Sequence, residues 1–157
     1  MIAVNSRLPE GNLQQRVNNE TITHNVQALF ADKTVVLFAV PGAFTPTCSV
    51  AHLPGYVVQA DEFKAKGVDA IICLAVNDAF VMEAWGKSQN AENLMMLADG
   101  DGSFTTALGL EIATGGFGGL RSKRYAMVVK NGVVSQLHIE KPKEFEVSKA
   151  ENVLATL

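Results

Sequence analysis

Cys48 is the residue with the clearest chemical potential, and it ends the segment PGAFTPTC, residues 41–48. An apolar run at residues 35–40 predicts a strand before this segment, and a helical pattern begins near the cysteine. The unpaired N–H groups and the dipole at a helix N-terminus favour an anion there, so this position favours the thiolate over the thiol. Because the thiolate is the nucleophilic form, the sequence predicts an activated sulfur at a strand-to-helix junction.

Two further side chains are candidates for contacting this sulfur. Thr45, three residues before it, carries a hydroxyl that can donate to the sulfur or to an approaching oxygen. Apolar surroundings alone disfavour an anion, so a cation is needed nearby. We choose Arg124, since it opens an apolar strand at residues 125–129, where a solubilising charge has no evident use. From spacing alone, a structural cysteine and a surface arginine remain the alternative.

Other polar motifs have simpler interpretations. His52 follows Cys48 by one helical turn, and a Cys–His pair would indicate hydrolase chemistry. No acidic partner is evident, so we expect a polar histidine on a helix face. Residues 99–103 lack the later ligands of a calcium loop and predict a turn, and the glycine-rich residues 115–119 lack dinucleotide-loop spacing. We expect this glycine-rich loop to pass close to the active site, and Trp85 to lie in the core.

Composition indicates a compact globular chain. It has 157 residues, of which 48% are apolar and 18% charged, and its formal net charge is −3. This balance gives no support for a nucleic-acid or anionic-membrane partner. No apolar run reaches membrane-spanning length and residues 1–11 lack a secretory signal, so we expect a cytoplasmic protein. The two cysteines are too few for a disulfide scaffold or a zinc cluster, and we expect no bound metal.

Strand and helix patterns alternate along the chain after an extended, turn-rich start with a turn at residues 18–20. We predict strands at residues 34–40, 68–76, 94–97, 124–130 and 133–139, and helices at 25–31, 48–66, 79–88, 103–108 and 148–157. Thr23 is the expected cap of the first helix, and Pro54 is expected to kink the second. This order predicts an α/β, thioredoxin-like fold: a single domain over residues 1–157, with a central mixed sheet flanked by helices and an N-terminal extension.

The segment around Cys48 also resembles a known family. Pro41-x-x-x-Thr45-x-x-Cys48 matches the Pro-x-x-x-Thr/Ser-x-x-Cys signature of peroxiredoxins. The string PGAFTPTCS, followed by HLPG at residues 52–55, is similar to the type II branch, also called the peroxiredoxin five subfamily, within the redoxin superfamily. The likeness covers nearly the whole chain and includes residues 76–85, 97–100 and 121–125.

This resemblance implies a thiol peroxidase that reduces hydrogen peroxide and small alkyl hydroperoxides. Cys48 matches the peroxidatic cysteine, which attacks the O–O bond and becomes a sulfenic acid. Thr45 and Arg124 match the residues that hold the peroxide oxygens and the thiolate. Backbone N–H groups around Gly42 and Cys48 would complete this cradle, and Pro41 would shield the sulfenate. No metal, haem or flavin is implied, since the sulfur supplies the electrons.

Phe44 and Phe117 are the expected apolar collar of the substrate site, although ordinary packing in the core or in a dimer is an equal alternative. Type II relatives commonly pair through the active-site end of the fold, and the resemblance therefore implies a homodimer.

Cys73 has two interpretations. It lies in an apolar strand, where a cysteine is usually a small core residue, but type II relatives carry a cysteine at the matching place that could resolve the sulfenate. No cysteine occurs at residues 140–157, where the family has an alternative resolving residue. This favours a one-cysteine cycle, in which external glutathione with a separate glutaredoxin regenerates the enzyme. The alternatives are a two-cysteine cycle through Cys73 with thioredoxin, and a redox sensor that does not turn over.

Overall fold

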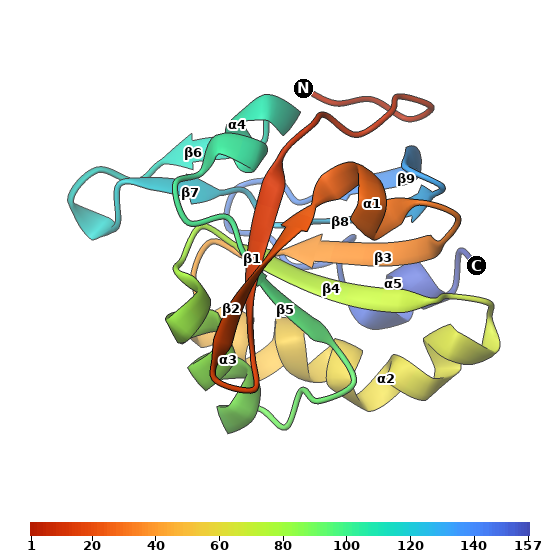
Figure 1. Ribbon diagram of the computed structural model, residues 1–157, viewed down its shortest axis with the longest axis horizontal. Coiled ribbons are helices and arrows are strands. Elements are labelled where there is room, and N and C mark those ends of the chain that lie inside the picture. Colours follow the sequence, from red (N-terminus) through yellow and green to blue (C-terminus); the bar gives the residue numbers. More distant parts are fainter.

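A seven-stranded mixed sheet forms the centre of the computed structural model, which describes residues 1–157, and helices cover both faces of this sheet (Figure 1). The strands are β1 (Asn12–Val17), β2 (Glu20–Asn25), β3 (Thr34–Ala39), β4 (Ala70–Ala75), β5 (Met95–Ala98), β8 (Tyr125–Lys130) and β9 (Val133–Ile139), in the spatial order β2-β1-β5-β4-β3-β8-β9. A separate two-stranded sheet pairs β6 (Glu111–Ala113) with β7 (Leu120–Ser122). The helices are α1 (Val26–Phe30), α2 (Leu53–Ala65), α3 (Ala79–Ser88), α4 (Ser103–Leu108) and α5 (Ala150–Leu154).

The middle of the sheet has the predicted thioredoxin-like arrangement. Strands β3, β4 and β5 are parallel neighbours, and α2 and α3 make the connections between them. Strands β8 and β9 form an antiparallel hairpin through Asn131 and Gly132, and β8 pairs with β3. Five of the six residues of β3 are buried, as expected for a strand that is covered on both faces.

Side chains of β3 alternate between two packed cores. Val36 and Phe38 point toward α2, α3 and α5, whereas Val35 and Leu37 point toward α1 and α4. Phe38 is fully buried and stacks on Tyr56 with ring centroids 3.9 Å apart, a burial that contributes roughly 2–3 kcal/mol. Figure 1 shows the corresponding layers, with α2 and α3 on one side of the sheet and α1 and α4 on the other.

The N-terminal extension, which we expected to be extended and turn-rich, contains a β-hairpin. Strands β1 and β2 pair along their full length, and β1 adds to the sheet beside β5 through Gln14 and Ala98. The predicted turn lies between them, where Asn18 and Asn19 have φ values of 50° and 65° that asparagine tolerates better than most residues. We did not predict the two strands because only Leu13 among their residues is buried, so the apolar alternation is absent.

Helix limits agree with the prediction where a local cap sets them. Helix α3 begins after Asp78, whose carboxylate accepts the Val81 N–H at 2.8 Å. The expected cap of α1 was wrong, because Asn25 rather than Thr23 accepts an N–H in the first turn. Helix α5 is also shorter than predicted, covering Ala150–Leu154 instead of residues 148–157.

No helix combines the length and the apolar character that crossing a membrane requires.

Candidate active site

The chain between β3 and α2 places Cys48 at the start of a helix. The first helical hydrogen bond runs from the Ser49 N–H to the Thr45 carbonyl at 2.9 Å, so Thr45 is the capping residue and Pro46 the first helical residue. Cys48 is then the third helical residue. Its N–H and that of Gly42 donate to no acceptor within the protein. Both are therefore available to donate to a ligand.

Contacts from the β4–α3 region hold this loop. The Ala43 N–H donates to Asn77 Oδ1, and Trp85 Nε1–H donates to Ser49 Oγ, both at 3.0 Å. Trp85 is fully buried, as predicted. Between these anchors Phe44 has a φ of 65°, a left-handed conformation that costs a bulky residue about 1–3 kcal/mol. The anchors thus hold the loop in a conformation it would not adopt alone.

The helix entered at Pro46 is not regular. Residues Cys48–His52 form a π-helical turn, in which the Leu53 N–H donates to the Cys48 carbonyl, and α2 follows. Pro54, which we expected to kink this helix, follows the π-helical turn and occupies the first turn of α2, where its missing N–H costs little. Single π turns are frequent at functional sites, and this one includes the candidate nucleophile.

Thr45 and Arg124 both contact the sulfur. Thr45 Oγ1 lies 2.9 Å from Cys48 Sγ and 2.7 Å from the Gly42 carbonyl, and Arg124 Nη2–H donates to Sγ at 3.1 Å. A hydroxyl has one proton, so Thr45 donates to the sulfur when the sulfur is anionic. When the sulfur carries a proton, Thr45 can accept it and donate to Gly42 instead. The geometry is thus compatible with both protonation states of the Cys48 sulfur.

Buried His52 fixes the other side of the Arg124 guanidinium. Arg124 Nη1 lies 2.8 Å from His52 Nδ1, and His52 Nε2 lies 3.2 Å from the Ser148 carbonyl. Because a guanidinium only donates, Nδ1 must accept and Nε2 must carry the proton. Our expectation of a polar residue on a helix face was wrong, since the imidazole is fully buried and packs against Phe38, with ring centroids 4.9 Å apart.

Burial, together with the Arg124 charge, lowers the pKa of His52 to about 3, and the hydrogen bond to Ser148 offsets this only in part. His52 is therefore neutral at neutral pH, as acceptance from Arg124 requires.

This shift predicts a loss of stability in acid. Below about pH 6.5 the unfolded chain protonates His52 while the folded chain does not, so the free energy of unfolding falls by up to about 1.4 kcal/mol per pH unit until pH 3. Urea unfolding between pH 7 and pH 4 measures this slope in the wild type and in His52→Gln. We expect a shallower slope in the variant. The lowered pKa of Glu140 affects the wild type and the variant alike, so it cancels in the difference between the two slopes. Equal slopes would contradict the assignment.

Residues after β9 hold in place the Ser148 carbonyl, which contacts His52. The Ser148 carbonyl also accepts the Tyr56 hydroxyl at 2.7 Å. Glu140 Oε2 accepts from Ser148 Oγ, Ser148 N–H and Glu146 N–H at 2.6–2.9 Å. Burial raises the pKa of Glu140, but these hydrogen bonds outweigh it and the net shift is downward. Sequence analysis did not select Glu140, Ser148 or Tyr56, and no short motif marks them.

The glycine-rich loop is held near the active-site loop by Arg121. Arg121 Nε–H donates to the Gly118 carbonyl at 3.0 Å, and Nη1–H donates to the Val76 carbonyl at 2.9 Å. A Cβ on Gly42 would lie 3.8 Å from Arg121 Nη1, which places this arginine beside the Cys48 loop. A side chain at Gly118 would meet Arg121 Nε at 2.6 Å, so glycine is needed for this approach.

The two candidate collar residues lie outside the core. Phe44 is 56% exposed with its ring centroid 6.5 Å from that of Trp85, and Phe117 is 71% exposed. Core packing is therefore the wrong interpretation for both. Pro41 and Arg124 line a pocket of about 320 Å³, and neither phenylalanine contributes to it.

Cys73 lies in β4, in the same packed core as Cys48, and both thiols are free. Its side chain is fully buried. Burial, aided by the charge at Cys48, raises the pKa of the Cys73 thiol well above its ordinary value. Cys73 is therefore protonated and weakly nucleophilic in this conformation.

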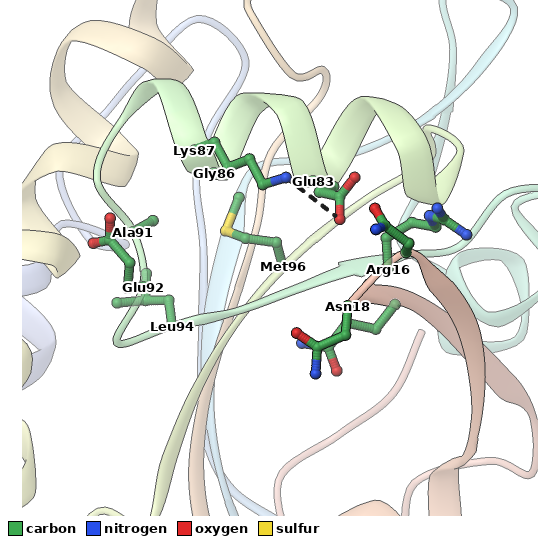
Figure 2. A pocket seen from close by; sticks show the side chains of 11 residues that line it. Arg16, Asn18, Glu83, Gly86, Lys87, Ala91, Glu92, Leu94 and Met96 are labelled. Atoms are coloured by element: carbon green, nitrogen blue, oxygen red, sulfur yellow. Dashed lines mark ion pairs between the residues drawn. The ribbon is translucent and has the colours of Figure 1, made fainter.

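A larger hollow of about 420 Å³ lies between the β1–β2 hairpin and α3 and shares no residue with the Cys48 site. Figure 2 shows its lining, where Arg16 and Lys87 stand beside Glu83, and Lys87 Nζ lies 3.8 Å from Glu83. Charges of both signs line it, and nothing there resembles a nucleophile.

A buried sulfur at a helix N-terminus, flanked by a hydroxyl and a guanidinium on a thioredoxin-like sheet, defines a thiol-dependent redox site. Comparison with known proteins agrees. The redoxin family model matches residues 3–154. Peroxiredoxin-2D of Arabidopsis thaliana is 45% identical over 99% of this chain and 98% of its own. Reduced Prx3 of Vibrio vulnificus, solved in complex with hydrogen peroxide, is 63% identical with a TM-score of 0.98 over 99% of both chains.

A 1-Cys peroxiredoxin of Plasmodium falciparum is 29% identical with a TM-score of 0.90, over 97% of this chain and 96% of its own. The chain belongs to the redoxin family and is a peroxiredoxin of the type II, or peroxiredoxin five, branch. As a peroxiredoxin, it is a thiol peroxidase.

Proposed function

We propose that Cys48 is the peroxidatic nucleophile and that Thr45 and Arg124 bind the peroxide and stabilise the transition state. One observation carries this proposal: Cys48 Sγ lies 2.9 Å from the Thr45 hydroxyl and 3.1 Å from Arg124 Nη2, at the third position of a helix. These donors contact the sulfur, from which charge moves to the departing oxygen during the reaction. The free N–H groups of Gly42 and Cys48 are two more donors.

The reaction balances without a bound cofactor. The thiolate of Cys48 attacks one peroxide oxygen, an S–O bond forms, and the O–O bond breaks. The sulfur is oxidised by two electrons to a sulfenic acid, and the departing oxygen takes up a proton and leaves as water or an alcohol. Hydrogen peroxide and small alkyl hydroperoxides are the proposed substrates. The Vibrio relative, solved with hydrogen peroxide, supports the first of these.

For the return to the thiol, we favour a one-cysteine cycle. Glutathione condenses with the sulfenic acid and releases water. A second glutathione, aided by glutaredoxin, then attacks the glutathione sulfur of this mixed disulfide. The S–S bond to Cys48 breaks, the Cys48 thiolate is regenerated, and oxidised glutathione leaves. The buried, protonated state of Cys73 supports this cycle, because a resolving thiol must reach the sulfenate as a nucleophile. The relative named as a 1-Cys peroxiredoxin is consistent with it.

Turnover of a Cys73→Ala variant tests this cycle. We expect wild type and variant to consume hydrogen peroxide equally with glutathione and glutaredoxin, and mass spectrometry to find a glutathione adduct on Cys48. Loss of turnover in the variant, with a Cys48–Cys73 disulfide in the wild type, would instead establish the two-cysteine cycle with thioredoxin. A single burst without turnover on either reductant would indicate a redox sensor.

We further propose a cytoplasmic homodimer. Large apolar side chains are exposed on the active-site loop, on α3 and on the glycine-rich loop, where Phe44, Phe80 and Phe117 are 56%, 61% and 71% exposed. Such side chains favour burial in a subunit interface. Sedimentation equilibrium of wild type and Phe117→Ser tests this, and a monomeric wild type would contradict it.

A further inference from the structure

The pocket of about 320 Å³ beside Arg124 has the form of an extension of the reacting site. Pro41 and Thr47 from the Cys48 loop line it together with Arg124, the residue whose guanidinium contacts the sulfur. Residues 139–145, which begin at the last residue of β9, line it as well. A ligand bound at Arg124 that is larger than hydrogen peroxide would extend into this pocket.

Positive charge predominates in the lining. Three lysines join Arg124, namely Lys123, Lys141 and Lys143, whereas Glu140 and Glu144 are the only acids. None of the three lysines forms an ion pair, since the ion pairs of the chain are Lys87–Glu83 and Lys149–Glu146. Glu140 is engaged by hydrogen bonds from Ser148 and Glu146. A cationic pocket on a chain with a net charge of −3 is a local feature and does not reflect the overall composition.

Apolar side chains line the same pocket as these charges. They belong to Ile112, Ile139 and Phe145. The Arg124 guanidinium lies 5.7 Å from the centroid of the Phe145 ring, so an apolar surface continues directly from the reacting end. Lys143 adopts a φ of 65°, which is unfavourable for a residue with a long side chain.

We propose that this pocket is a subsite for the carboxylate of an organic molecule that reacts at Cys48. The apolar surface accommodates a carbon stem, while Lys141, Lys143 and Lys123 attract the anion at its end. The inference rests on the proposed role of Cys48. Two sources provide this chemistry: a hydroperoxide that carries a carboxylate, in the oxidising step, and a carboxylate-bearing peptide thiol such as glutathione, in the reducing step.

The experiment compares matched probes in both steps. In the oxidising arm, quench-flow measures the rate constants for cumene hydroperoxide and for the same compound with a para-carboxylate. In the reducing arm, it measures reduction of the Cys48 sulfenate by glutathione and by glutathione diethyl ester. The readout is the ratio of the carboxylate-bearing to the neutral probe, in wild type, in Lys141→Gln/Lys143→Gln, and in the control Lys130→Gln. Lys130 is an exposed lysine at the end of β8, outside the pocket.

We expect the wild-type ratio to exceed one by about three- to tenfold in at least one arm and to fall with added salt, as for contacts with exposed lysines. The double variant should reduce that ratio to about one, and Lys130→Gln should keep it. A loss confined to the oxidising arm identifies a substrate carboxylate, and a loss confined to the reducing arm a reductant carboxylate.

A wild-type ratio of one in both arms, or a ratio that the double variant leaves unchanged, overturns the subsite. Both substituted lysines are exposed, so the variant is expected to fold, and circular dichroism checks this. A wild type that reacts with neither hydroperoxide would instead contradict the proposed peroxidatic role of Cys48. The experiment therefore distinguishes failure of the subsite from failure of the proposed function.

Discussion

Replacement of Cys48 by serine is expected to reduce peroxide consumption to the rate of protein-free buffer. A serine hydroxyl does not ionise near neutral pH, and its oxygen does not accept a second oxygen as sulfur does, so both the attack and the two-electron oxidation are lost. The fold should persist, because the new hydroxyl can still accept hydrogen bonds from Thr45 and Arg124 in place of the sulfur. Stopped-flow consumption of hydrogen peroxide measures the effect, and thermal unfolding monitors the fold.

Cys73→Ala is the matched control for this variant. It removes the other thiol from the same packed core, and we expect it to retain oxidation of Cys48 in the first turnover. The reverse pattern, with peroxide consumed by Cys48→Ser and not by Cys73→Ala, would assign the reacting sulfur to β4 and contradict the proposed site.

The parts of the site that could be predicted are those encoded in short stretches of chain. Thr45 and Cys48 are three residues apart, and the strand before them and the helix after them each follow from local patterns. Helix α3 was predicted at the correct residues, 79–88, for the same reason. Arg124 is 76 residues from the sulfur. It was found because a charge at the entrance to an apolar strand is unusual, and because a family resemblance supported it.

The residues that were missed act through distant contacts. His52 was noticed and misjudged, because its burial depends on packing by Phe38 and on Ser148, 96 residues away. Glu140 and Ser148 form their hydrogen bonds in an irregular segment that has no recognisable sequence motif. The π-helical turn at Cys48–His52 was also missed, since helix propensity does not distinguish an i→i+5 turn from a regular one.

His52 and Glu140 belong to one chain of contacts that ends at the sulfur. Glu140 holds Ser148, the Ser148 carbonyl accepts from His52, and His52 accepts from Arg124, which donates to Cys48. Every member has one compatible protonation state at neutral pH: an ionised carboxylate, a neutral imidazole with its proton on Nε2, and a guanidinium. The arrangement therefore fixes the plane of the guanidinium as well as its position, and this distinguishes arginine from any other cation at residue 124.

Arg124→Lys is accordingly expected to lower the second-order rate constant for hydrogen peroxide by about 10²–10³-fold, the usual cost of losing one donor from a charge-stabilising site. A lysine ammonium keeps the positive charge but is more compact. It cannot donate in one plane to both Cys48 Sγ and His52 Nδ1, which Arg124 contacts at 3.1 Å and 2.8 Å. Stopped-flow kinetics measures the rate, and thiolate ultraviolet absorbance monitors ionisation of the sulfur separately.

The two readouts separate charge from geometry. A variant that retains the thiolate signal and loses the rate indicates that Arg124 acts by orienting donors toward the peroxide; loss of both indicates that its charge mainly stabilises the thiolate. Arg16→Lys is the control, because Arg16 lies on β1, with its guanidinium over Phe80 and donating to Thr21. An Arg124→Lys enzyme as fast as this control would show that any cation suffices, and the fixed guanidinium plane would then have no part in catalysis.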